Sequence, residues 1–200
     1  YRTRWSELFG QFVDEDASEL ADLDNREDPL LVAIAKELIH FGEEKVHSGF
    51  ARIYKRLRPQ LMRTLMNLYD ESYRLDYENH RATWRPIFFT GHSLGGALAT
   101  LASFDTAVNY YKIGVRSAGD VSCTTFGCPR VGNAAFQRLY DRTISHNWRF
   151  VVASDVVTKM PRFTNYTHVG IQVLLTHQGN LLVDPSFIEL NWWHHLHTSH

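Results

Sequence analysis

A serine stands between two glycines at residues 91–95, which read Gly-His-Ser-Leu-Gly. An apolar predicted strand precedes this motif, and the small residues of a predicted helix follow it. A Gly-x-Ser-x-Gly motif in that context is typical of a strained turn that exposes a nucleophile. The glycines two positions before and two positions after Ser93 would let strand and helix approach without a Cβ clash. The hydroxyl would then lie at a helix N-terminus, where backbone N–H groups such as that of Leu94 can stabilise an oxyanion. An ordinary strand-to-helix turn that contains a serine is the alternative.

A serine hydroxyl becomes a nucleophile when a base takes its proton, and the base in turn needs an orienting carboxylate. Asp155 follows the predicted strand 148–153 and opens a loop, which places it at the sheet edge expected for the nucleophile. Asp120 precedes a strand, Asp141 lies within a predicted helix and Asp184 follows a predicted hairpin, so these three fit less well. A loop aspartate that caps a turn is the alternative role for Asp155.

Histidines that follow Asp155 are the candidates for the base. His168 and His177 lie on a predicted hairpin, where a histidine is commonly a hydrogen-bonded structural residue. A terminal loop can bring a histidine to the nucleophile more easily than a strand can. The terminal group consists of His194, His195, His197 and His200. Spacing alone leaves the choice among these histidines open.

Composition indicates one soluble globular domain across residues 1–200, with 44% hydrophobic residues and a net charge of −1. That charge speaks against a nucleic-acid partner, and no apolar run approaches the roughly 18 residues of a transmembrane segment. Cys123 and Cys128 are expected to be buried thiols rather than a disulfide. The terminal histidines lack cysteine or carboxylate partners at the spacings of structural zinc sites. We therefore expect no metal site.

Hydrophobic periodicity predicts alternating strands and helices, and hence an α/β fold whose mostly parallel sheet has helices on both faces. The predicted strands are 87–90, 121–126 and 148–153, followed by a hairpin of 167–175 and 180–183. The predicted helices are 30–41, 48–77 and 133–144. Asn133 is the expected cap of the last helix, and Pro59 predicts a break or kink near Arg58.

An acidic segment precedes the first predicted helix. Residues 14–28 contain eight acidic side chains against the single Arg26, a composition typical of a solvated loop. Asp28 and Pro29 then form a helix start, because aspartate caps well and proline suits the first helical position.

Several of these stretches resemble those of the class 3 lipases, the fungal-type triacylglycerol lipases with their plant and algal relatives. The matching stretches occur in the family order over about residues 46–195. They are VHSGF at 46–50, TGHSLGGALA at 90–99, TFGCPRVGN at 125–133, DVV at 155–157 before a proline, and YTHVG at 166–170.

The resemblance implies an α/β-hydrolase fold that needs no cofactor, with Ser93 as nucleophile and Asp155 as the acid of the triad. It implies that His168 is structural and that the base lies near the end of the domain. His195 is then the expected base, with His194 and His200 as alternatives. The family usually places a tyrosine a few residues after this histidine, and none follows His195 here.

The amino-terminal part departs from the family pattern. Relatives carry an Arg-Gly-Thr or Arg-Gly-Ser strand end that supplies an oxyanion donor, and residues 1–46 contain neither. We therefore expect the chain to begin beyond that stretch and to lack the N-terminal strands, which leaves the Leu94 N–H as the oxyanion donor. The likeness also makes residues 5–45 a candidate lid, whose apolar helix 29–41 would swing out in transient contact with a lipid surface. A fixed packing helix is the alternative.

The function predicted on these grounds is hydrolysis of carboxylic esters of lipids through an acyl-enzyme. Acylglycerols, phospholipids and galactolipids all fit, because the sequence does not place the side chains of an acyl pocket. The alternative is a catalytically inactive lipase-like domain kept for binding or regulation.

Overall fold

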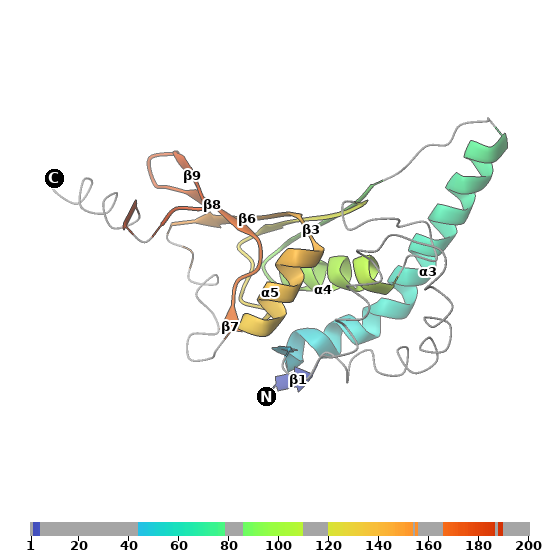
Figure 1. The fold of residues 1–200 in the computed structure, drawn as a ribbon, viewed down its shortest axis with the longest axis horizontal. Helices are drawn as coiled ribbons and strands as arrows, with labels where there is room; N and C mark the ends of the chain where they lie inside the picture. The colour runs from blue at the N-terminus through green and yellow to red at the C-terminus, as the bar shows by residue number, and fades with distance from the viewer. Residues whose placement is uncertain are drawn as a thin grey trace.

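The computed structural model describes residues 2–4, 44–78, 86–109, 120–153, 155, 166–186 and 188–189. The predicted helix 30–41, the candidate lid before Glu44 and the terminal histidines lie outside the described residues. The described residues form two sheets and three helices, which are shown in Figure 1.

The larger sheet carries the nucleophile turn and has five strands in the order β3-β4-β6-β8-β9. Its strands β3, β4, β6 and β8 are parallel, and β9 pairs antiparallel with β8. This arrangement confirms the predicted mostly parallel α/β sheet. The strands are β3 (Ile87–His92), β4 (Val121–Phe126), β6 (His146–Val152), β8 (Ile171–Leu175) and β9 (Leu181–Val183).

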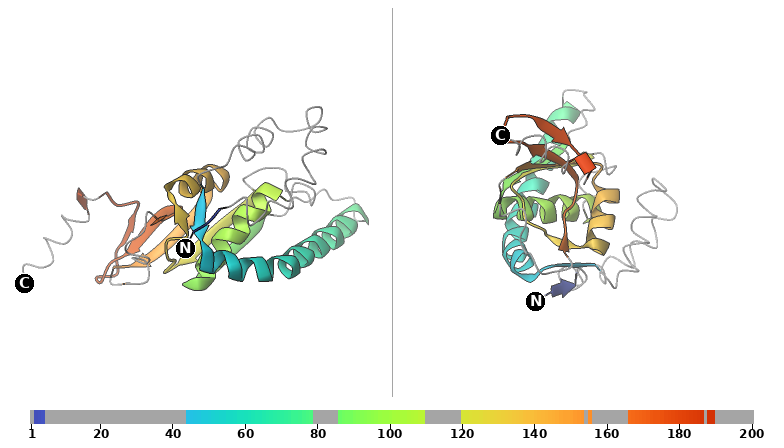
Figure 2. Two further views of the ribbon diagram at one scale, coloured as in Figure 1. Left: turned by 90° about the horizontal axis from the view of Figure 1, so that it is seen from below. Right: turned by 90° about the vertical axis from the view of Figure 1, so that its left-hand side faces the viewer.

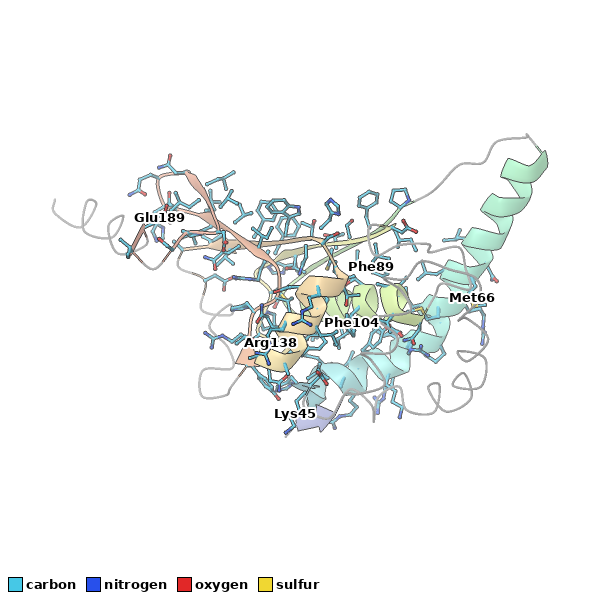
Figure 3. The ribbon with its side chains drawn as sticks, in the orientation of Figure 1. Lys45, Met66, Phe89, Phe104, Arg138 and Glu189 are labelled. Atoms are coloured by element: carbon cyan, nitrogen blue, oxygen red, sulfur yellow. The ribbon has the colours of Figure 1, made fainter. Side chains whose placement is uncertain are left out.

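Three helices, α3 (Ser48–Glu78), α4 (Leu94–Asn109) and α5 (Ala134–Thr143), lie on one side of this sheet (Figures 1 and 2). Buried aromatic side chains join α4 to α5, since the Phe104 ring lies 5.6 Å from that of Phe136. Side chains on the opposite face point away from the helices (Figure 3), and Phe88 there is 75% exposed. The helical layer expected on that second face is therefore not found among the described residues.

A second, four-stranded sheet lies beside the helices and was not predicted. Its strands β1 (Arg2–Arg4), β2 (Lys45–His47), β5 (Gly132–Asn133) and β7 (Tyr166–Thr167) pair antiparallel in the order β1-β2-β5-β7. The predicted strand 167–175 is therefore wrong, because β7 and β8 belong to different sheets. Gly170 separates them with a φ of 76°, a backbone conformation that suits glycine. The hairpin of β8 and β9 is confirmed.

Helix α3 runs through Pro59 without a break, so of the break or kink that the sequence predicted only a change of direction is present. Proline removes one helical hydrogen bond, the one that the carbonyl of Lys55 would accept. Lys55 and Pro59 are both exposed, so water can solvate that carbonyl. The axis of α3 changes direction along its length (Figure 1), which is how a helix commonly accommodates proline.

Helix α5 begins as predicted. Asn133 is its N-cap, and the side-chain oxygen accepts hydrogen bonds from the Phe136 N–H at 3.1 Å and from the Lys45 N–H at 3.0 Å. One amide thus caps α5 and ties it to β2. The predicted apolar stripe of this helix is buried, and it consists of Phe136, Leu139, Tyr140 and Ile144.

A buried ion pair joins α3 to α4. Arg58 donates through Nε to Asp105 Oδ2 at 2.7 Å and through a terminal nitrogen to Oδ1 at 3.0 Å. The Tyr54 hydroxyl donates to the same carboxylate at 2.5 Å, and the Asn109 amide does so at 2.7 Å. Because both charges are desolvated yet hydrogen-bonded on several sides, the cluster fixes how α3 crosses α4.

Candidate active site

Ser93 occupies a sharp turn between β3 and α4. Its φ is 51°, which is strained for a residue with a side chain and typical of functional turns. The Ser93 N–H donates to the Phe126 carbonyl at 2.9 Å, which extends the pairing of β3 with β4 by one residue. Its carbonyl accepts from the N–H groups of Gly96 at 3.0 Å and Ala97 at 3.3 Å, which starts α4. The strained turn that the sequence predicted is present.

Two of the glycines around this turn are required by close contacts. A Cβ on Gly91 would collide with the Gly95 carbonyl and lie 2.7 Å from the Gly96 nitrogen. A Cβ on Gly96 would lie 3.1 Å from the Cβ of Cys128. A Cβ on Gly95, in contrast, would meet no described atom within 4 Å. The expectation of a clash two positions after the nucleophile is therefore wrong.

Leu94 is the first residue of α4, and its side chain is 43% exposed. The N–H groups of a first helical turn have no acceptor within their own helix. They also lie at the positive end of the helix dipole. The Leu94 N–H thus has the position that an oxyanion donor needs.

Asp155 lies at the same edge of the sheet as Ser93. The carboxyl ends of parallel strands share one edge, and Ser93 follows β3 whereas Asp155 follows β6. The Asp155 N–H donates to the Val152 carbonyl at 2.9 Å, which turns the chain at the end of β6. Since β4 separates the two strands, about 10 Å of sheet lies between them. That gap is suited to an imidazole between hydroxyl and carboxylate.

Gly127, at the end of β4, makes room for this carboxylate, a role that the sequence reasoning missed. Its φ is 56°, and a Cβ there would lie 2.8 Å from Asp155 Oδ2 and 3.5 Å from His92 Nε2. Its N–H donates to the Phe150 carbonyl at 2.9 Å, which fixes the glycine between two strands. In the sequence, this role could have been inferred from a glycine that directly follows a parallel strand and faces the loop that carries the candidate acid.

The three other aspartates considered lie at the opposite edge. Asp120 directly precedes β4, and Asp184 follows the antiparallel β9. Asp141 lies on α5, where it accepts from the Gly170 N–H at 2.7 Å and from the Gln137 amide at 2.5 Å. Gly170 directly precedes β8, whose amino end marks that edge.

The two histidines of the hairpin region, His168 and His177, lie at opposite edges of the sheet. His168 lies between β7 and β8, at the amino ends of the parallel strands and thus at the edge opposite Ser93. His177 lies in the turn after β8, at the same edge as Ser93. It is separated from β3 by three strand spacings, or about 14 Å, which exceeds the reach of an imidazole. His194, His195, His197 and His200 lie outside the described residues.

Both cysteines are buried free thiols, as predicted. Burial raises the pKa of Cys128 to about 12 and also raises that of Cys123. Cys128 packs behind Gly96, so the thiols support the nucleophile turn from the core and are not themselves reactive groups.

Within the part of the chain that the structure describes, no group of three or more histidine, cysteine or acidic side chains is placed to hold a metal ion. None of the described helices combines the length and apolar character needed to cross a membrane.

A strained serine turn at the carboxyl edge of a mostly parallel sheet, with a carboxylate two strands away, defines an α/β-hydrolase type of site. The family model for Lipase (class 3) matches residues 15–165. The chain therefore belongs to the class 3 lipase family.

Known proteins of this family are similar over most of the chain. Phospholipase A1-II 1 of rice (Oryza sativa subsp. indica) is 32% identical over 150 residues, which are 70% of this chain and 36% of that protein. Lipase II from Rhizopus niveus aligns in structure with a TM-score of 0.58 and 27% identity, over 72% of this chain and 50% of that one. A triacylglycerol lipase whose catalytic centre is a serine protease triad aligns with a TM-score of 0.58 and 28% identity, over 72% of this chain and 49% of that one. The chain spans 20% to 36% of the length of the curated relatives it matches.

Proposed function

We propose that residues 1–200 act as one domain that hydrolyses carboxylic esters of lipids through a Ser-His-Asp triad. The observation that carries this proposal is the positive φ of Ser93 at a strand-to-helix turn, with Asp155 at the same sheet edge. A strained serine is costly to keep, and Ser93 is half-buried at the edge where substrate would bind.

In the proposed reaction, Ser93 Oγ attacks the ester carbonyl while the histidine base takes its proton. The carbonyl oxygen becomes negatively charged, and the Leu94 N–H stabilises that charge. Collapse of the intermediate releases the alcohol, which receives the proton from the histidinium. Water, deprotonated by the same histidine, then hydrolyses the acyl-enzyme, and Asp155 orients the imidazole throughout.

His195 is our first choice for the base, with His194 and His200 as alternatives. The chain length permits all three, because nine residues from Ser186 to His195 span at most about 30 Å when extended. The four strand spacings from β9 to β3 amount to about 19 Å. Because β9 ends at the opposite edge, the chain must also pass the 5 residues of a strand such as β8, about 17 Å, which gives a straight-line distance of about 25 Å.

Lipid esters are the proposed substrates because the relatives include a phospholipase A1 and a triacylglycerol lipase. We also propose that residues 5–45 form a lid over the site. Deleting residues 14–41 should then raise activity on soluble short-chain esters, since such substrates need no lipid surface to open the lid. Unchanged activity on those esters would contradict the lid.

The nucleophile is tested by labelling the protein with a fluorophosphonate probe and mapping the adduct by mass spectrometry. We expect the adduct on Ser93 and no adduct in Ser93→Ala. If folded wild-type protein stays unlabelled with and without detergent, the triad is not assembled, and an inactive binding domain becomes the better account.

A further inference from the structure

The outer face of α3 carries an unusual set of basic side chains. Arg52, Arg56 and Arg63 follow one another at spacings of four and seven residues, which places them along one side of the helix. Lys55 lies one turn from Arg52 on the same outer side. All four are exposed, and together they are called the basic face below.

No acidic residue lies in the part of α3 that carries the basic face. Residues 48–68 contain neither aspartate nor glutamate, so like charges at Arg52 and Arg56 repel each other without a neighbour to offset them. The first turn of α3 also lacks the acidic side chains that favour a helix N-terminus. Within the described ranges, Arg58 is paired with Asp105, whereas no described carboxylate pairs with the basic face. The face therefore has the charge and exposure to bind a polyanion.

The chain itself contains a polyanion that is tethered beside α3. Residues 14–28 hold eight acidic side chains and one arginine. They belong to the stretch between β1 and β2, and these two strands pair with each other in the register Arg2 with His47. Because Ser48 begins α3 directly after β2, both ends of that stretch are held at the amino end of the helix.

The tether is long enough for contact. Asp14 lies ten positions after Arg4, and an extended chain of that length spans up to about 33 Å. The basic face from Arg52 to Arg63 is only about 17 Å long. A tethered segment also has an effective concentration in the millimolar range, which favours it over a free anion of equal charge.

We propose that the acidic segment 14–28 docks on the basic face of α3. Several charges on each side then form a network, which is worth more than an isolated surface pair but is screened by salt. The inference is independent of esterase activity. An anionic lipid surface has the same chemistry and is the competing occupant, so the experiments below separate the two.

Carbodiimide cross-linking tests the contact directly, because it joins a lysine amine to a carboxylate without a spacer and Lys55 is the lysine of the basic face. At about 0.01 M ionic strength, where the Debye length is about 30 Å, we expect monomeric protein to give cross-links from Lys55 to residues 14–28. These should fall several-fold at about 1 M salt, where the Debye length is about 3 Å. Lys55→Arg keeps the charge and must abolish the cross-links. Their absence from the wild-type monomer would overturn the proposal.

Proteolysis gives a second readout. A protease that cleaves after glutamate can cut at Glu15 and Glu19 only when the segment leaves the basic face. The triple variant R52Q/R56Q/R63Q should therefore be cut several-fold faster at both sites. The control is R138Q/R142Q, which removes two exposed arginines from α5 and should leave the rate unchanged. Equal rates in wild type and the triple variant would contradict docking.

Binding to vesicles tests whether an anionic lipid surface occupies the basic face in place of the acidic segment. If the acidic segment covers the basic face, a variant with D14N, E15Q, D16N and E19Q should bind phosphatidylglycerol-containing vesicles several-fold more tightly than wild type. If wild type binds these vesicles as tightly as that variant, the face is open to lipid and the proposal is wrong.

Discussion

Gly127 is the residue whose missing side chain lets the Asp155 carboxylate approach the end of β4. An added Cβ would lie 2.8 Å from Oδ2 at a φ of 56°. We expect Gly127→Ala to displace the carboxylate and to slow fluorophosphonate labelling of Ser93 by about 10- to 100-fold, because a misplaced orienting group costs that much. The labelling rate is measured on protein whose circular dichroism matches that of wild type.

A matched control separates displacement of the carboxylate from backbone strain. Gly179 has a φ of 83°, and a Cβ there would meet no described atom within 4 Å. Gly179→Ala therefore introduces comparable strain without a contact to Asp155 and should leave the labelling rate unchanged. A similar loss of labelling in both variants would show that strain, and not displacement, is the cause.

At the residue scale, sequence could place Ser93 and Asp155 because each follows a strand, and parallel strands end at one edge. It could not assign the glycines, whose roles depend on contacts across the turn. Gly91 and Gly95 look equivalent in the sequence, yet only a Cβ on Gly91 would strike the backbone of the turn. Gly127 faces a side chain 28 positions further along the chain, which local spacing does not reveal.

At the scale of elements, Asn133 links helix α5 to strand β2. Its oxygen accepts from the N–H groups of Phe136 and Lys45, so Asn133→Ala leaves two half-buried donors without that acceptor. We expect the free energy of unfolding, measured by urea denaturation, to fall by about 1–2 kcal/mol. Asn133→Asp keeps a side-chain oxygen as acceptor, so its free energy of unfolding should fall clearly less than that of Asn133→Ala. Equal losses in the two variants would contradict the capping role.

The ion pair between α3 and α4 gives a second prediction at this scale. Asp105→Leu removes the carboxylate that the buried Arg58 contacts at 2.7 Å, and we expect a loss of about 3–5 kcal/mol in the free energy of unfolding. The double variant Arg58→Met/Asp105→Leu removes both charges, so its free energy of unfolding should fall less than that of the single variant. Urea denaturation of both variants checks this order, and the reverse order would show that Arg58 stabilises the protein even without the Asp105 carboxylate.

Elements with long periodic patterns were predictable, and short ones were not. β4 matches its predicted range because Val121–Phe126 is a clear strand pattern, and α5 has both a cap and an apolar stripe. The strands β5 and β7 have two residues each, too few for any periodicity. Sequence left open whether Pro59 breaks or bends α3, because it does not show that this turn of the helix faces water.

At the scale of the whole molecule, buried acids link stability to pH. Burial raises the pKa values of Cys123 and Cys128, in the second case from 9.0 to about 12, and raises that of Tyr140 well above 10.0. All three side chains are buried in the core. The folded protein therefore holds protons that the unfolded chain releases at alkaline pH.

Between pH 9 and about 12 the unfolded chain has lost the Cys128 proton while the folded protein still holds it. Unfolding then releases a proton, so stability falls as pH rises, by about 1.4 kcal/mol per pH unit for each such group. We expect the free energy of unfolding of wild type to decline steeply above pH 9 in urea titrations. Cys128→Ala leaves a small cavity that lowers stability below pH 9, but its decline above pH 9 should be shallower by about 1.4 kcal/mol per unit, so the two curves converge as pH rises. Parallel curves for the two proteins would mean that the folded state ionises Cys128 near its ordinary pKa, and hence that water reaches the core behind Gly96.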